Sequence, residues 1–170
     1  MNISARTPTN TNFLQPNRFK LVFPKVPNLE YFCQSIDLPE ISMEPVEHAN
    51  PFNKLFITSV NTIFDPLEVD VIVDEDLRAW QEIHDWLTGS SFPRNFLEYA
   101  VAKEKGLYSE MGLISLNNAN NPIINFTFHH CFPIRLGKLR LTSSDTGTES
   151  QLTVPVTFRY DDYEIRRMKD

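Results

Sequence analysis

The chain has 170 residues, of which 41% are hydrophobic and 22% charged, and its formal net charge at pH 7 is -6. This length suits one domain with a sizeable core, and the composition is that of a folded globular protein. No cluster of Lys and Arg is longer than the pair Arg166-Arg167, so the sequence lacks the basic face that tight nucleic-acid binding requires.

No apolar run approaches the roughly 20 residues that a membrane-spanning helix needs. The N-terminus also lacks the basic-then-apolar pattern of a signal peptide. We therefore expect a soluble protein that is not secreted and has no membrane partner. Cys33 and Cys131 are too few for a disulfide framework, so we expect two reduced, buried thiols.

Residues 1–17 are rich in Asn, Thr and Pro, and Phe13 and Leu14 are their only pair of bulky apolar residues. We interpret this segment as an extended arm that precedes a single domain at residues 18–170. Two interpretations stay open for it. The segment is either a frayed terminus, or Phe13 and Leu14 dock onto a neighbouring subunit.

Short strands are indicated from Arg18 onward. Phe19, Leu21 and Phe23 share one face of a first strand, and an apolar stretch at residues 29–36 indicates a second strand that pairs with it as a hairpin.

Residues 39–53 then carry three prolines and the acidic residues Glu40, Glu44 and Glu47, which predicts an extended loop rather than a helix or a buried strand. Such a long loop either contacts a partner or simply crosses the surface.

Residues 55–73 predict two strands broken near Asp65-Pro66, and Asp74 is placed to cap a helix that runs to about Leu87 and ends at Thr88-Gly89. The apolar stripe of this helix is expected to contain Leu77, Trp80, Ile83, His84 and Leu87. Trp86 falls off the edge of that stripe, which makes it a candidate for a contact between subunits.

The second half is again β, with strands predicted at residues 107–116, 123–132, 136–141 and 152–160. In the last strand the alternate residues from Leu152 to Tyr160 share one face. Pro155 points the other way and indicates an edge strand or a bulge, because proline cannot donate a hydrogen bond to a sheet. The fold class is therefore mainly β with one flanking α-helix.

The sequence gives little support for a catalytic or metal-binding site. His129 and His130 are adjacent on a predicted strand, so their side chains point to opposite faces and cannot easily share an ion. His84 has no partner nucleophile, and the acids that follow Val73 fit a helix start. The Gly-x-Ser-x-Gly, phosphate-loop and His-Glu-x-x-His patterns are absent. We predict a protein that is not an enzyme and that takes no cofactor and no metal.

Three segments in chain order resemble the tail-tube proteins of contractile-tailed bacteriophages, a family related to the type VI secretion tube. The first ends in Leu38-Pro39, and the second is a strand followed by Asp74-Glu75-Asp76 and a helix with Trp80. The third, at residues 126–160, contains Cys131-Phe132-Pro133, Leu136-Gly137-Lys138-Leu139, Ser143-Ser144-Asp145 and Val156-Thr157-Phe158-Arg159-Tyr160. The ordered set covers roughly residues 18–165.

This resemblance implies two packed antiparallel sheets with a flanking helix, and a hexameric ring that stacks into the inner tail tube. It implies that the loop at 39–53 reaches the adjacent ring and that the tail sheath and baseplate are partners. The protein would then be part of the virion tail, assembled in the host cytoplasm. An acidic subunit suits a lumen through which DNA passes without specific binding.

Residues 1–17 leave open a second role in the same family, that of a junction or initiator protein between tube and baseplate. A free-standing β-sandwich binding module is the alternative from another class, and an enzyme ranks third. A tube subunit must expose strand edges that are completed only in the ring, whereas a binding module stays monomeric and needs a ligand cleft.

Overall fold

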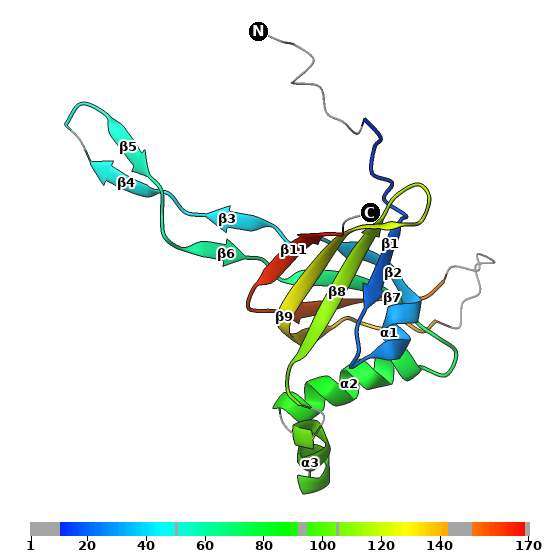
Figure 1. The fold of residues 1–170 in the computed structure, drawn as a ribbon. Helices are drawn as coiled ribbons and strands as arrows, with labels where there is room; N and C mark the ends of the chain where they lie inside the picture. Colours follow the sequence, from blue (N-terminus) through cyan, green and yellow to red (C-terminus); the bar gives the residue numbers. More distant parts are fainter. Residues whose placement is uncertain (1–10, 50, 92–94, 105, 143–150, 169–170) are drawn as a thin grey trace.

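The computed structural model describes residues 11–49, 51–91, 95–104, 106–142 and 151–168. Strands dominate, as the sequence predicts, and helices are few (Figure 1). In chain order the elements are β1 (Phe19–Val22), α1 (Pro27–Phe32), β2 (Cys33–Asp37), β3 (Ile41–Met43), β4 (Val46–Ala49), β5 (Lys54–Ile57), β6 (Thr62–Phe64), β7 (Leu67–Ile72), α2 (Arg78–Ser91), α3 (Phe96–Glu104), β8 (Ser109–Leu116), β9 (Pro122–Leu136), β10 (Thr153–Arg159) and β11 (Tyr163–Arg167).

The body is built from two antiparallel sheets that share the long strand β9. The first part of β9 pairs with β8 and β11, and its last part, Phe132–Leu136, pairs with β10, which continues through β7 to β2. Between these parts the register shifts, and His130 has a left-handed φ of 54°. Such a bulge bends a strand and increases its twist, so one strand can serve two facing sheets. The predicted antiparallel β fold is confirmed.

An aromatic core fills the space between the sheets. Phe23, Phe128 and Phe158 are fully buried, and the rings of Phe23 and Phe158 meet edge to face with centroids 5.3 Å apart. Helix α2 lies across one end of the β body and contributes Ile83 and Trp86 to this core (Figure 1). Aromatic pairs of this geometry stabilise a core beyond the apolar area that they bury.

The start of α2 follows the prediction, but its buried face does not. The Asp74 carboxylate accepts hydrogen bonds from the main-chain N–H groups of Arg78 and Ala79, as expected of a cap. The buried face follows Ala79, Ile83 and Trp86, spaced i, i+4 and i+7, and the helix continues past Gly89 to Ser91. The predicted stripe was therefore displaced: Ile83 is buried as expected, but Leu77 precedes the helix and is exposed, and the buried face includes the small Ala79 and the large Trp86.

Several other boundaries also differ from the predictions. Residues 27–32 form a short helix, not part of a strand, and β1 pairs with β8 rather than with the segment that follows it. Helix α3 was not predicted, and β9 continues through Pro133 to residue 136, where the sequence indicated two strands with the second ending at 141.

Pro155 occupies an inner strand of the second sheet. Strand β10 lies between β9 and β7, so the edge-strand alternative was wrong, and the irregularity against β9 falls between Thr157 and Phe158. The Pro155 carbonyl accepts a hydrogen bond from Gly137 N–H at 2.8 Å, just beyond the end of β9. A Cβ atom at Gly137 would lie 2.6 Å from Pro155 Cγ, so only glycine fits this close approach.

Both thiols are free, with Cys131 buried and Cys33 half-buried. Burial, followed by the nearby Glu110 carboxylate, raises the pKa of Cys131 to about 12. Burial and Asp70 raise the pKa of Cys33 to about 11. The reactive thiolate form is therefore disfavoured at both positions.

Candidate assembly surface

A long two-stranded arm, formed by residues 40–64, projects from the body (Figure 1). It continues the β2–β7 pairing outward, first as β3 with β6 and then as β4 with β5. The predicted loop at 39–53 is thus the outgoing half of a hairpin, and the loop prediction was wrong. Its prolines, Pro39, Pro45 and Pro51, all fall between strands, where no ladder hydrogen bond is lost.

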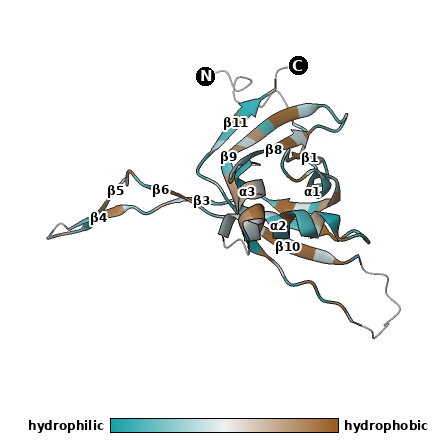
Figure 2. Cartoon of the chain, turned by 90° about the horizontal axis from the view of Figure 1, so that it is seen from below, coloured by the Kyte–Doolittle hydropathy of each residue, from teal (hydrophilic) through white to brown (hydrophobic). Residues whose placement is uncertain are grey.

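The arm exposes apolar side chains along its length, away from the core (Figure 2). The cross-strand pair Val46 and Ile57 is exposed, and so is Phe56 on the other face. A two-stranded hairpin alone is marginally stable in water, and a contiguous exposed apolar surface marks an interaction site. The full set of large exposed apolar residues on the arm is Ile41, Met43, Val46, Phe52, Leu55, Phe56, Ile57, Val60 and Ile63.

The three acidic residues chosen from the sequence all lie on this arm and are exposed. Glu40 stands at its base, and its carbonyl accepts a hydrogen bond from Asp65 N–H. Glu44 lies in the connection between β3 and β4, and Glu47 forms a 2.7 Å ion pair with Lys54 on the facing strand. Because that pair joins the two strands, Glu47 also contributes to the hairpin itself, although exposed pairs stabilise little.

The other predicted contact residues do not gather on the arm. Phe13 and Leu14 are 91% and 68% exposed and lie in a segment outside any helix or strand, ahead of β1. Trp86 is only 6% exposed and belongs to the core, where its indole N–H donates to the Leu107 carbonyl. Its placement off the helix's apolar stripe was wrong, so it contributes no side chain to a contact surface.

An aromatic cluster anchors the base of the arm to the core. Phe64, the last residue of β6, packs against Tyr160 and Tyr163 with centroids 6.1 and 5.8 Å apart. The Tyr160 hydroxyl donates to the Asp65 carbonyl at 2.9 Å. Burial raises the pKa of Tyr160 to about 12, so the hydroxyl remains a donor at neutral pH. This anchor fixes the direction in which the arm leaves the body.

Helix α3 and several strand edges also expose surface that could contact another chain. Helix α3 exposes Phe96, Leu97 and Tyr99 next to α2, at the bottom of the view in Figure 1. Among the described strands, β1, β2 and β11 each pair on one side only, so their other edges are open to pairing with another chain.

His84, His129 and His130 each contact a different group. His129 faces Glu110, with Nδ1 3.6 Å from a carboxylate oxygen, whereas His130 Nδ1 lies 2.9 Å from Asp161. His84 stacks on Trp80 with centroids 5.1 Å apart. Within the described ranges, no three His, Cys, Asp or Glu residues come close enough to hold a metal ion.

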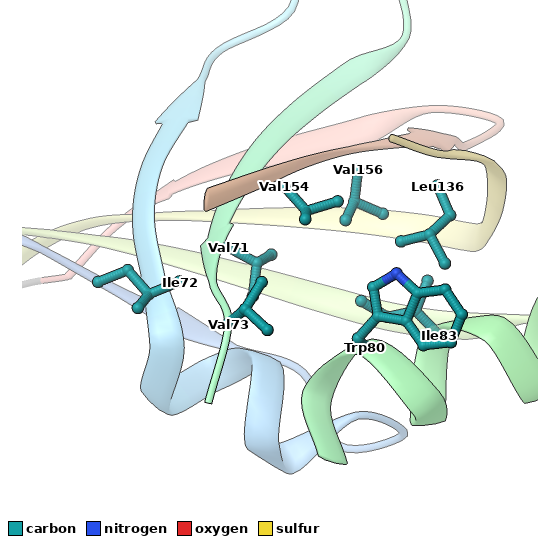
Figure 3. Close-up of a pocket in the computed structure, with 8 residues that line it drawn as sticks. All are labelled: Val71, Ile72, Val73, Trp80, Ile83, Leu136, Val154 and Val156. Atoms are coloured by element: carbon teal, nitrogen blue, oxygen red, sulfur yellow. The ribbon is translucent and has the colours of Figure 1, made fainter. Parts of the chain in front are cut away.

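A shallow hollow lies between α2 and the second sheet (Figure 3). It is lined by Val71, Ile72, Val73, Trp80, Ile83, Leu136, Val154 and Val156. This lining is aliphatic apart from the Trp80 indole, so it offers packing surface and one hydrogen-bond donor but no pair of reactive groups. None of the described helices is long and apolar enough to cross a membrane.

An antiparallel β body that holds an apolar arm, an apolar helix and open strand edges outside its own core has the features of an assembly subunit, because monomeric proteins rarely expose large apolar patches. The sequence matches the family model described as phage tail tube protein over residues 5–166, and the chain belongs to this family. The resemblance seen in the sequence is confirmed. The chain is a structural protein of the tail-tube type.

Solved structures of contractile particles share this fold. A chain in the cryo-EM structure of the anti-feeding prophage cap has a TM-score of 0.69 and 14% identity, with 99% of this chain and 100% of that chain covered. A chain of the sheath/tube terminator of the PVC extracellular contractile injection system has a TM-score of 0.64 and 14% identity, with coverage of 92% and 99%.

A chain of the anti-feeding prophage baseplate has a TM-score of 0.60 and 17% identity, with 93% of this chain and 97% of that chain covered. At these identities the likeness is one of fold. No curated protein sequence matches this chain.

Proposed function

We propose that this protein forms hexameric rings that stack into the inner tube of a contractile phage tail. The observation that carries the proposal is the arm, whose apolar side chains are exposed on both faces although its base is anchored in the core. A side chain that is exposed in the free subunit and covered in the assembly favours assembly without being needed for folding. The open edges of β1, β2 and β11 support lateral pairing in the same ring.

The arm is the element that reaches the adjacent ring. Full burial of a large apolar side chain contributes about 1.5–3 kcal/mol relative to exposure. Covering Val46, Phe56 and Ile57, each about half to two thirds exposed, would therefore contribute several kcal/mol per arm, roughly 3–5 by this area rule. The arm is long enough to stand clear of its own body (Figure 1).

The tube serves as a conduit for DNA ejection, and DNA passes without specific binding. The net charge of -6 supports this, because a surface that attracts phosphate would retain DNA. The tail sheath and the baseplate are the other partners, and assembly takes place in the host cytoplasm. The protein contributes no catalysis, cofactor or metal site to this process.

A junction or initiator protein between tube and baseplate is the second candidate. The exposed Phe13–Leu14 segment favours it, because a segment outside the sandwich can bind a partner that differs from the next ring. A free-standing binding module fits less well, since the described hollow is shallow and has a single polar group.

Light-scattering mass and negative-stain electron microscopy at several concentrations test the proposal. Six-fold tubes are expected for the repeated subunit and isolated six-fold rings for the junction role, whereas a particle that stays monomeric at every concentration would contradict both. Reversing the charge of Glu40 and Glu44 should weaken ring stacking, measured by sedimentation, more than it weakens subunit folding. Unchanged stacking in that variant would show that these two carboxylates do not contribute to the contact between rings.

A further inference from the structure

The second sheet has an open edge at each of its two ends. At one end β2 pairs with β7, and no described strand pairs with its other side. At the other end residues 132–136 of β9 pair with β10 alone, because the pairing of β9 with β8 stops at Cys131 and its bonds to β11 and the preceding turn stop at His129. The main-chain groups on the open side of each edge are therefore available to a further strand.

The charges near these two edges are opposite in sign. Residues 26–53, which contain β2 and the outgoing half of the arm, include five acidic residues and no Lys or Arg. Residues 132–144, which contain the end of β9, include three basic residues and no acidic one. The exposed acidic residues next to β2 are Asp37 and Glu40, and the exposed basic residues at the other edge are Arg135, Lys138 and Arg140.

Asp37 and Arg135 stand at the two ends of one cross-strand row. Asp37 is opposite Glu68, Glu68 is opposite Thr157, and Thr157 is opposite Arg135. Facing residues of neighbouring strands project from the same face of a sheet, and here it is the outer face, because the adjacent residues of both edge strands pack against the core. Among the described residues neither Asp37 nor Arg135 forms an ion pair.

A second copy placed beside the first can continue this sheet. The strands in the order β9, β10, β7 and β2 are antiparallel throughout, so β2 and the end of β9 run in opposite directions. When copies repeat in the same orientation, β2 of one copy meets the end of β9 of the next as a further antiparallel pair. This contact joins two different edges, so it is heterologous and closes into a ring where the rotation between copies allows it.

The first sheet is less suited to the same contact. Its open edges are β1 and β11, and Lys20 and Arg166 stand at the two ends of one of its cross-strand rows. A join between these edges would bring two positive charges together, which destabilises a strand pair. Arg166 is also engaged by Glu164 of its own strand, with nitrogen and oxygen 2.7 Å apart. Charge therefore favours the second sheet.

We propose that the open edge of β2 in one copy pairs with residues 132–136 of β9 in the next copy, with Asp37 beside Arg135, so that the second sheets of neighbouring copies form one continuous sheet. This inference rests on the proposed self-assembly and names the contact within a ring. The arm continues β2 and β7 outward beyond this edge and stays available for the contact between rings (Figure 1).

Disulfide trapping in full-length chains tests the contact. A chain with both Asp37→Cys and Arg135→Cys cross-links only between copies, because the two positions lie three strand spacings apart, roughly 14 Å, beyond the reach of a disulfide. We expect a ladder of disulfide-linked oligomers that ends at six copies on a non-reducing gel. The matched control carries Lys20→Cys and Arg166→Cys at the edges of the first sheet, and the wild-type chain with its two free thiols is the blank.

The outcomes of this experiment separate the contact from the proposed function. Rings or tubes that form without the cross-link between positions 37 and 135 would overturn the contact and leave the proposed function standing. Cross-linking through the control pair in its place would assign the join to the first sheet and overturn the contact as well. A chain that stays monomeric and without cross-links at every concentration would contradict both proposals.

Charge reversal tests the pairing of the two side chains. Asp37→Arg and Arg135→Asp should each raise the concentration needed for assembly about 2- to 10-fold, measured by sedimentation velocity. The double variant restores opposite charges in exchanged positions and should recover assembly. Thermal unfolding of all three variants should stay close to that of the wild type, because both side chains are exposed. A double variant that folds but assembles no better than the single variants would refute the pairing.

Discussion

Replacing Phe56 in the arm by serine should separate assembly from folding. Phe56 is 67% exposed, so about two thirds of its burial free energy remains available to a partner, about 1–2 kcal/mol per arm. Loss of this contribution raises the concentration needed for each contact about 5- to 30-fold. The subunit itself loses only the contact with the facing residue Glu47, for which about 0.2–1 kcal/mol is typical.

The assay compares two measurements on the same variant. Sedimentation velocity over a concentration series reports assembly, and urea unfolding followed by tryptophan fluorescence reports subunit stability. Thr58→Ala, also exposed on the arm, is the matched control because it removes a polar group instead of an apolar one. Assembly of Phe56→Ser like the wild type, or folding weakened as much as assembly, would show that Phe56 does not act through a contact between subunits.

Three further substitutions test the fold that supports the arm. Tyr160→Phe removes the hydrogen bond at the base of the arm and should cost about 1 kcal/mol of unfolding free energy, with faster amide exchange in the arm. Gly137→Ala should cost about 1–3 kcal/mol because its Cβ meets Pro155 at 2.6 Å, whereas Gly112→Ala, with its nearest contact at 3.6 Å, should cost less. Asp74→Ala should cost about 0.5–2 kcal/mol through loss of the helix cap, measured by thermal unfolding.

Each of these substitutions has an outcome that contradicts its physical reason. Unchanged amide exchange in the arm of Tyr160→Phe would mean that the aromatic packing of Phe64 holds the base by itself. Equal stability of the two glycine variants would show that the end of β9 can move away from Pro155. An Asp74→Ala protein as stable as the wild type would indicate that water replaces the cap at no cost.

The sequence predicted correctly those elements in which buried and exposed side chains follow a regular pattern. In the last β stretch, Val154, Val156, Phe158 and Tyr160 are buried and Pro155 is exposed, as alternation requires. Asp74 caps α2 because its carboxylate accepts hydrogen bonds from main-chain N–H groups that the first turn leaves unpaired. Such residues carry a local signal that does not depend on partners far away in the chain.

The outgoing half of the arm was missed, whereas the strands predicted from residue 55 onward match its returning half. Strands β3 and β4 are short and exposed on both faces, and the prolines between them suggested a loop. The anchor was also missed, since Phe64 and Tyr160 are brought together only by the fold. Glu40, Glu44 and Glu47 are exposed, as charged residues usually are, and their part in a contact between subunits stays a prediction.

Two other predictions were wrong, one for the short helix at residues 27–32 and one for the buried face of α2. The helix at residues 27–32 and a buried strand have similar composition over six residues, and periodicity cannot separate them. Trp86 was misplaced because the predicted stripe was centred on Trp80 and Leu87, whereas the buried face of the helix passes through the small residues Ala79 and Gly89, which places Trp86 in the core.

The proposed function requires the protein to assemble through surfaces that the free subunit leaves exposed. Cryo-electron microscopy of the assembled particle tests this requirement, because it locates the arm relative to neighbouring copies. We expect a six-fold ring in which Val46, Phe56 and Ile57 are covered by a copy in the adjacent ring. An ordered particle of another symmetry, or a six-fold one in which the arm remains surrounded by solvent, would contradict it.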